Sequence, residues 1–170
     1  MFKAAVSTRR ARTAGRLALS AALLLSMSLY VSSVLASTSH AGWPKINGKT
    51  IINSHDRNEV IRGDKSKHNE LLGGNGNDTI YGGEAGDVIW GDYKPGDQPT
   101  SQFDRIYAGN GKNFIYTSHG TNIVYTGSGP SIVHAHFGTG TIRCGSSAVT
   151  VEVIHHSGYR LLGGCKRVID

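Results

Sequence analysis

The sequence predicts an all-β chain whose nine-residue repeats stack into a β-solenoid. Two observations favour this class. Glycine accounts for 23 of the 170 residues, about twice its usual share, and large aliphatic side chains recur every nine residues. Leucine is scarce beyond residue 35, which argues against a helical bundle. A chain of this length is expected to form one domain.

The aliphatic ladder covers most of the chain after residue 51. Its members are Ile52, Ile61, Leu71, Ile80, Ile89, Ile106, Ile115, Val124, Val133 and Ile142. Glycine recurs at the fourth position of most repeats, which suits a turn residue with positive φ. Each repeat is expected to be a turn of about six residues followed by a strand of about three, whose inward aliphatic is buried only when neighbouring strands stack.

Two consecutive blocks carry the repeat in its fullest form. Residues 73–81 read Gly-Gly-Asn-Gly-Asn-Asp-Thr-Ile-Tyr, and residues 82–90 read Gly-Gly-Glu-Ala-Gly-Asp-Val-Ile-Trp. They resemble the hemolysin-type calcium-binding (RTX) repeat, Gly-Gly-x-Gly-x-Asp-x-U-x, in which U is a large aliphatic residue. The resemblance implies a right-handed parallel β-roll. Each nonamer makes half a turn, so the turns on one side belong to alternate repeats.

The resemblance also implies bound Ca²⁺, an ion that takes six to eight oxygen ligands. The family supplies them from the sixth-position aspartate and from carbonyls of the glycine-rich turn. Alternation predicts two flanks, one with turn 73–78 against loop 91–104 and one that stacks turns 63–69, 82–87 and 108–113. The ligands expected, within residues 63–113, are Asp64, Asp78, Asp87, Asp92 and Asp104, together with Gly73, Asn75, Gly82 and Glu84; Asp97 lies in the same loop.

Later repeats lack an acid at the sixth position. Asn113, Asn122 and Ser131 stand there instead and are expected to hydrogen-bond along the stack as a neutral ladder. The alternative for the first turns is that such bonds hold them without a cation. Calcium is favoured over that alternative because neighbouring carboxylates in one acidic patch repel each other.

Residues 1–41 have the parts of a secretory signal peptide. A basic run, an uncharged segment rich in Leu and Ala (Leu17 to Leu35) and small residues follow one another, with cleavage expected after Ala36 or Ala41. The alternative is an uncleaved membrane anchor, since about 19 residues can just span a bilayer. Removal would leave residues 42–170 with a charge of about +1, which gives no support for a nucleic-acid partner or for membrane binding.

The two cysteines follow the last repeat. In an exported protein an even count favours a disulfide, here between Cys144 and Cys165. The predicted organisation is thus a solenoid over residues 42–143 and a disulfide-closed cap over residues 144–170. Such a cap would cover the open end of the stack, where backbone and apolar core are otherwise exposed.

An apolar stripe is predicted on one outer sheet face. If loop 91–104 leaves the alternation intact, this face carries the candidate partner residues Trp90, Phe114, Tyr116 and His134. Three interpretations stay open: coverage by the segment around Trp43 and Ile46, binding of a glycan or protein partner, and an aromatic ladder that stabilises adjacent rungs. The ladder is favoured.

No catalytic motif is found in the sequence. His-Glu-x-x-His, Gly-x-Ser-x-Gly and phosphate-loop patterns are all missing from it. Solvated turn residues are the default interpretation of His119, His134 and His136, with a zinc or copper site as the alternative. The sequence therefore predicts a secreted, non-enzymatic, calcium-binding protein with a structural or adhesive role at the cell surface or outside the cell. The alternative is a glycan-binding or polysaccharide-active extracellular protein.

Overall fold

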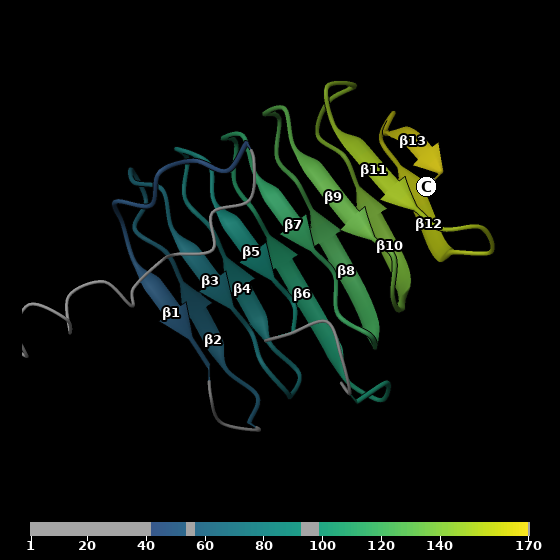
Figure 1. The fold of residues 1–170 in the computed structure, drawn as a ribbon, viewed down its shortest axis with the longest axis horizontal. Coiled ribbons are helices and arrows are strands. Elements are labelled where there is room, and N and C mark those ends of the chain that lie inside the picture. Colours follow the sequence, from purple (N-terminus) through teal and green to yellow (C-terminus); the bar gives the residue numbers. More distant parts are fainter. Residues whose placement is uncertain (1–41, 54–56, 93–98, 170) are drawn as a thin grey trace, which may run out of the picture. The chain divides into compact units, whose positions relative to one another are not determined.

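The computed structural model describes residues 42–53, 57–92 and 99–169, which belong to one compact unit. These residues form strands and no helix, and the strands wind into a parallel β-solenoid with two sheets (Figure 1). The first sheet contains β1 (Thr50–Ile52), β3 (Glu70–Leu72), β5 (Val88–Trp90), β7 (Phe114–Tyr116), β9 (Ile132–Ala135), β11 (Thr150–Val153) and β13 (Lys166–Ile169). The second contains β2 (Val60–Arg62), β4 (Thr79–Tyr81), β6 (Phe103–Tyr107), β8 (Thr121–Tyr125), β10 (Thr139–Arg143) and β12 (Gly158–Leu162).

The core is a double column of aliphatic side chains between the two sheets. Consecutive strands alternate between the sheets, so that Leu71, Ile89 and Ile115 are in register in the first sheet. Ile80, Ile106 and Val124 are in register in the second. All six are fully buried. The all-β solenoid predicted from the nine-residue period is confirmed, and loop 91–104 preserves the alternation as expected.

The first rung differs from the expected ladder. Ile51, not Ile52, pairs with Leu71 and packs against the core. Ile52 is 48% exposed. Side chains of a strand alternate between its faces, so a register shift of one residue turns the neighbouring side chain outward. Ile51 and the next inward residue, Ile61, are ten positions apart, one more than the nonamer period.

Glycines of the fourth repeat position serve two different purposes. Gly76 has φ +131°, as expected for a turn residue. Gly129 is not in the left-handed region, and there a Cβ atom would collide with the carbonyl oxygen of Asn110 in the turn beneath it. The general expectation of positive φ at this position is therefore wrong. Close approach of stacked backbones explains Gly129 instead.

The C-terminal segment extends the solenoid. β11 pairs in parallel with β9 and β13, and β12 pairs in parallel with β10. The disulfide between Cys144 and Cys165 joins the end of β10 to the start of β13. The predicted disulfide is confirmed, and within residues 144–169 the strands β11, β12 and β13 continue the parallel pairing of the stack.

The outer face of the first sheet is partly covered by residues that precede β1. This segment runs back along the sheet toward β7 (Figure 1), and Trp43 packs edge-on against Trp90 and Tyr116. Gly42 lies against Phe114, which is only 4% exposed. Phe114 is therefore not available on the candidate partner face, in contrast to the expectation. Trp90, Tyr116 and His134 stay half-buried there.

Aromatic side chains stack along both outer faces. Trp90, Tyr116 and His134 form one column, with ring centroids 3.9 Å and 4.4 Å apart. Tyr81, Tyr107 and Tyr125 form the other, with both spacings 4.9 Å. Because the rings lie nearly parallel, each covers the face of its neighbour. This arrangement is the ladder that links adjacent rungs.

Candidate metal centre

The two flanks of the solenoid hold the side chains of the sixth repeat position inside their turns. We call the flank that carries Asp78, Asp92 and Asp104 the acidic flank. We call the flank that carries Asn69, Asp87 and Asn113 the amide flank. In both, these side chains are at most 4% exposed. The grouping of turns is the one expected from alternation between repeats.

Each sixth-position side chain accepts a hydrogen bond from the backbone of the rung before it. On the acidic flank, the Glu59 N–H donates to Asp78 Oδ1 and the Asp78 N–H donates to Asp104 Oδ1, both at 2.8 Å. On the amide flank the corresponding bonds run from Asn69 to Asp87 at 2.6 Å and from Asp87 to Asn113 at 2.9 Å. These backbone hydrogen bonds therefore position one oxygen of each carboxylate. The second oxygen depends on other groups for a partner.

The second carboxylate oxygen is satisfied differently on the two flanks. Asp87 Oδ2 accepts the Gly83 N–H at 2.5 Å, and Asp87 Oδ1 also accepts the side-chain amide of Asn69 at 2.7 Å. Asp78 Oδ2 and Asp104 Oδ2 are buried and accept no hydrogen bond from the described part of the chain. Buried polar atoms without a partner are rare in folded proteins and point to an ion or water.

Burial also changes the acidity of the acidic flank. It raises the pKa of Asp78 to about 7, and the negative charge of Asp104 adds to the rise. Burial raises the pKa of Asp104 to about 6, and the charge of Asp92 adds to the rise, while hydrogen bonds from the Asp78 backbone and the Ser118 side chain oppose it. Without a cation, these carboxyl groups therefore ionise only at a higher pH than an exposed aspartate does, because a buried charge loses its hydration.

On each flank, one backbone carbonyl oxygen and one carboxylate oxygen lie close to the same glycine. A Cβ atom on Gly73 would collide with the carbonyl oxygen of Gly91 and lie 3.0 Å from Asp78 Oδ2. Gly82 on the amide flank is cradled in the same way by Ala108 O and Asp87 Oδ2. Such all-oxygen surroundings suit Ca²⁺, which binds carboxylates and carbonyls. The donor set of the acidic flank therefore fits the ion.

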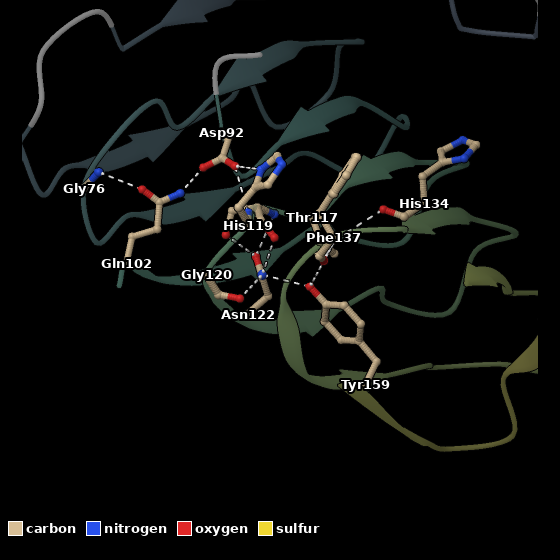
Figure 2. Close-up of polar contacts among 11 residues, drawn as sticks. Gly76, Asp92, Gln102, Thr117, His119, Gly120, Asn122, His134, Phe137 and Tyr159 are labelled. Atoms are coloured by element: carbon tan, nitrogen blue, oxygen red, sulfur yellow. Dashed lines mark hydrogen bonds and ion pairs between the residues drawn. The ribbon is translucent and has the colours of Figure 1, made fainter. Parts of the chain in front are cut away.

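Asp92 brings together residues that sequence reasoning did not connect. Its carboxylate accepts the Gln102 side-chain amide and, at 2.9 Å each, the backbone N–H and ring Nδ1 of His119 (Figure 2). The His119 ring in turn stacks on Phe137. Burial raises the pKa of Asp92, while the bonds from His119 oppose the rise. No repeat position predicts this group, because Asp92 and Gln102 lie in the loop that interrupts the nonamers.

Other expected ligands lie apart from the buried carboxylates. The Asp64 carboxylate accepts the Ser66 N–H in its own turn and forms an ion pair with Lys67 at 3.9 Å, so only the Asp64 backbone joins the stack beside Gly83. The exposed Glu84 carboxylate accepts the Asn110 side-chain amide. Asn75 is half-buried within turn 73–78. Asp97 lies outside the described residues.

The neutral ladder of the later repeats is present in the structure. The Asn113 N–H donates to Ser131 Oγ at 3.3 Å. Asn122 accepts the Ser118 hydroxyl at 2.9 Å and donates to the Tyr159 hydroxyl, as Figure 2 shows. The Tyr159 hydroxyl in turn donates to the Phe137 carbonyl oxygen at 2.8 Å. These turns are held by hydrogen bonds between neutral groups.

A family comparison decides what the repeats are. The family described as RTX calcium-binding nonapeptide repeat matches residues 66–92 and 100–133 in four copies. The chain carries RTX calcium-binding nonapeptide repeats. RTX nonapeptide repeats bind Ca²⁺, and the matched residues include both flanks described above.

Two further comparisons gave no relative. No curated protein and no solved structure matches the chain. Within the described ranges, the chain contains no helix that is long and apolar enough to cross a membrane.

Proposed function

We propose that this RTX chain is an exported, non-catalytic β-roll that Ca²⁺ stabilises through its acidic flank, with a structural or adhesive role outside the cell or at its surface. One observation carries the calcium assignment: Asp78 Oδ2 and Asp104 Oδ2 are buried one rung apart and have no hydrogen-bond donor among the described residues. A cation between them would remove the repulsion and replace the hydration that burial takes away.

The residues proposed to hold the ion come from adjacent turns of one flank. Asp78 and Asp104 supply buried carboxylate oxygens, and the Gly91 carbonyl faces Asp78 across the Gly73 cradle. Asp92, also buried, adds negative charge close to both. Asp87 is a weaker candidate because both of its carboxylate oxygens already accept hydrogen bonds from backbone or side-chain N–H groups.

Calcium titration of the chain and its variants tests this assignment. We expect the melting temperature of the native chain to rise with Ca²⁺, by the equivalent of about 2.7 kcal/mol at a hundredfold excess over Kd. The double variant Asp78→Asn with Asp104→Asn should lose the rise, since it removes both charges with little change in shape. Asp87→Asn, the matched change on the amide flank, should keep it.

Two outcomes would contradict the assignment. The first is a native melting curve that is the same in Ca²⁺ and in EDTA at neutral pH. The second is a calcium-induced rise that survives in the double variant but disappears in Asp87→Asn, which would place the ion on the amide flank.

Export is proposed from the order of segments in residues 1–41. The basic run, the uncharged Leu- and Ala-rich segment and the small residues before Gly42 match a cleaved signal. The disulfide between Cys144 and Cys165 suits an oxidising compartment. Mass spectrometry of the chain recovered outside expressing cells should give an N-terminus at residue 37 or 42. A full-length chain retained in the membrane fraction would show an anchor instead.

The glycan alternative has less support from the geometry. Sugar rings stack on free aromatic faces, whereas both aromatic columns here cover their faces by stacking on one another. A polysaccharide-cleaving pair of acids would have to reach its substrate, and Asp78 and Asp104 are at most 1% exposed. Release of reducing sugars from a polysaccharide panel would favour the enzyme; we expect none.

A further inference from the structure

One cluster of metal-ligating side chains lies away from the acidic and amide flanks. His134 is on β9, and Glu152 is its register partner on the neighbouring strand β11. Val133 and Ala135 point into the core, so His134 points outward, and Glu152 does so between the buried Val151 and Val153. His136 follows β9 with the same parity as His134. The three side chains thus meet on the outer face of the first sheet.

The geometry of this cluster is close to that of a metal site. His134 Nδ1 lies 2.6 Å from Glu152 Oε2. One ligand atom from each of His134, His136 and Glu152 lies within 4.8 Å of the others. The two imidazole rings are nearly perpendicular, at 81° with centroids 5.9 Å apart. All three side chains are half-buried.

Neighbouring contacts hold the first ligand in place. The His134 ring stacks on Tyr116 with an angle of 10° between the planes. Figure 2 shows this ring pointing away from the Asp92 and His119 network, so the cluster is separate from that group. A ring that is fixed by packing loses little freedom when it binds a metal.

We propose that His134, His136 and Glu152 form a second metal site, selective for Zn²⁺ over Ca²⁺. Two imidazoles and one carboxylate are a donor set that suits Zn²⁺, with the fourth tetrahedral position left to water. Ca²⁺ instead prefers an all-oxygen set. Ligand chemistry therefore directs Ca²⁺ to the acidic flank and Zn²⁺ to the His134, His136 and Glu152 cluster.

The site would stabilise the part of the solenoid that calcium does not reach. Beyond Asn122 the sixth repeat position holds Ser131 and Gly140, which offer no carboxylate. A Zn²⁺ ion bound to β9, to the residue after it and to β11 would link two adjacent rungs of the first sheet. Zinc is thus expected to raise the melting temperature in addition to the effect of calcium.

Zinc titration of the full chain in saturating Ca²⁺ tests the proposal. Calorimetry should show binding of Zn²⁺, and Co²⁺ in its place should give the visible absorption of a tetrahedral site. His136→Gln and Glu152→Gln should each weaken zinc binding by at least the 10–100-fold that changes of outer-shell partners typically cost. Both should keep the calcium-induced rise in melting temperature, which shows that they fold.

Two controls separate this site from other histidines. His155→Gln with His156→Asn removes two exposed turn histidines, and asparagine tolerates the φ of +66° at residue 156. His119→Asn removes the histidine beside Asp92. Both should bind zinc as the native chain does. The proposal is overturned if the native chain binds no zinc, if His136→Gln and Glu152→Gln bind it unchanged, or if either control abolishes binding.

Discussion

The acidic and amide flanks are both built on the sixth repeat position, but they stabilise a buried carboxylate in different ways. On the amide flank, Asp87 lies between Asn69 and Asn113, and three N–H groups surround its carboxylate. On the acidic flank, Asp78 is followed directly by Asp104, and one oxygen of each has no donor among the residues described.

From this difference we infer that the need for calcium depends on the neighbour in the stack rather than on the aspartate itself. A carboxylate that is stacked between amides is stabilised by N–H donors of the chain. A carboxylate that is stacked on another carboxylate keeps a buried charge that only a proton or a cation can offset. The nonapeptide alone does not distinguish these two cases.

The largest effect expected from this comparison is that of pH on the calcium-free chain. The pKa of Asp78 is raised to about 7 and that of Asp104 to about 6 in the folded state, above their unfolded values. The folded state therefore binds more protons than the unfolded state between about pH 4 and pH 7, and stability falls as pH rises through this range.

Melting curves in EDTA measure this dependence. The native chain should be more stable at about pH 5 than at about pH 8, and saturating Ca²⁺ should remove most of the loss because the ion replaces the protons. Asp78→Asn with Asp104→Asn should flatten the profile, whereas Asp87→Asn should not. A profile that is already flat in the native chain would show that the acidic flank carries no excess protons.

The next effect comes from making the amide flank resemble the acidic one. Asn113→Asp places a carboxylate beside Asp87, where the Asn113 amide now donates to the Gly111 carbonyl at 2.9 Å. Without calcium we expect a loss of about 3 kcal/mol, the cost of an unpaired buried charge. The loss should shrink as Ca²⁺ is added in chemical denaturation. A loss that is the same with and without Ca²⁺ would show that stacked acids are not enough to create a site.

The smallest effect is expected for Asp87→Asn. The substituted side chain still accepts a bond from Asn69, but one of its ends now offers a donor to the Gly83 N–H, which is also a donor. We expect a loss of about 1–2 kcal/mol that is independent of Ca²⁺. Denaturant melts with and without the ion measure it, and a loss that appears only in Ca²⁺ would assign an ion to the amide flank.

Much of the solenoid follows from the period of the sequence. An aliphatic side chain that recurs every nine residues can be buried only between stacked strands. The buried columns that contain Ile80 and Ile89 were therefore predictable. The disulfide was predictable from an even cysteine count. The expected position of the first rung was wrong by one residue because the sequence between Ile52 and Val60 has no repeat pattern to set the spacing.

The candidate site was only partly predictable. Asp78, Asp92 and Asp104 were expected to share a flank, and they do. Sequence reasoning did not separate them from Asp64, whose carboxylate pairs within its own turn. It also missed Gln102 and His119 as partners of Asp92. These contacts join residues 10 and 27 positions apart, and no local pattern records which side chain reaches across the stack.

Some features of this protein are thus determined by the chemistry of a single repeat, and others by the stacking of repeats. The nonapeptide determines where the chain turns, which side chain is inward and where an acid stands, because these depend on φ preferences and burial within one repeat. The neighbour of each acid is decided by the winding of the chain, since parallel strands bring together residues about 18 or 26 positions apart. The same winding places His134 beside Glu152, and no motif in the sequence joins them.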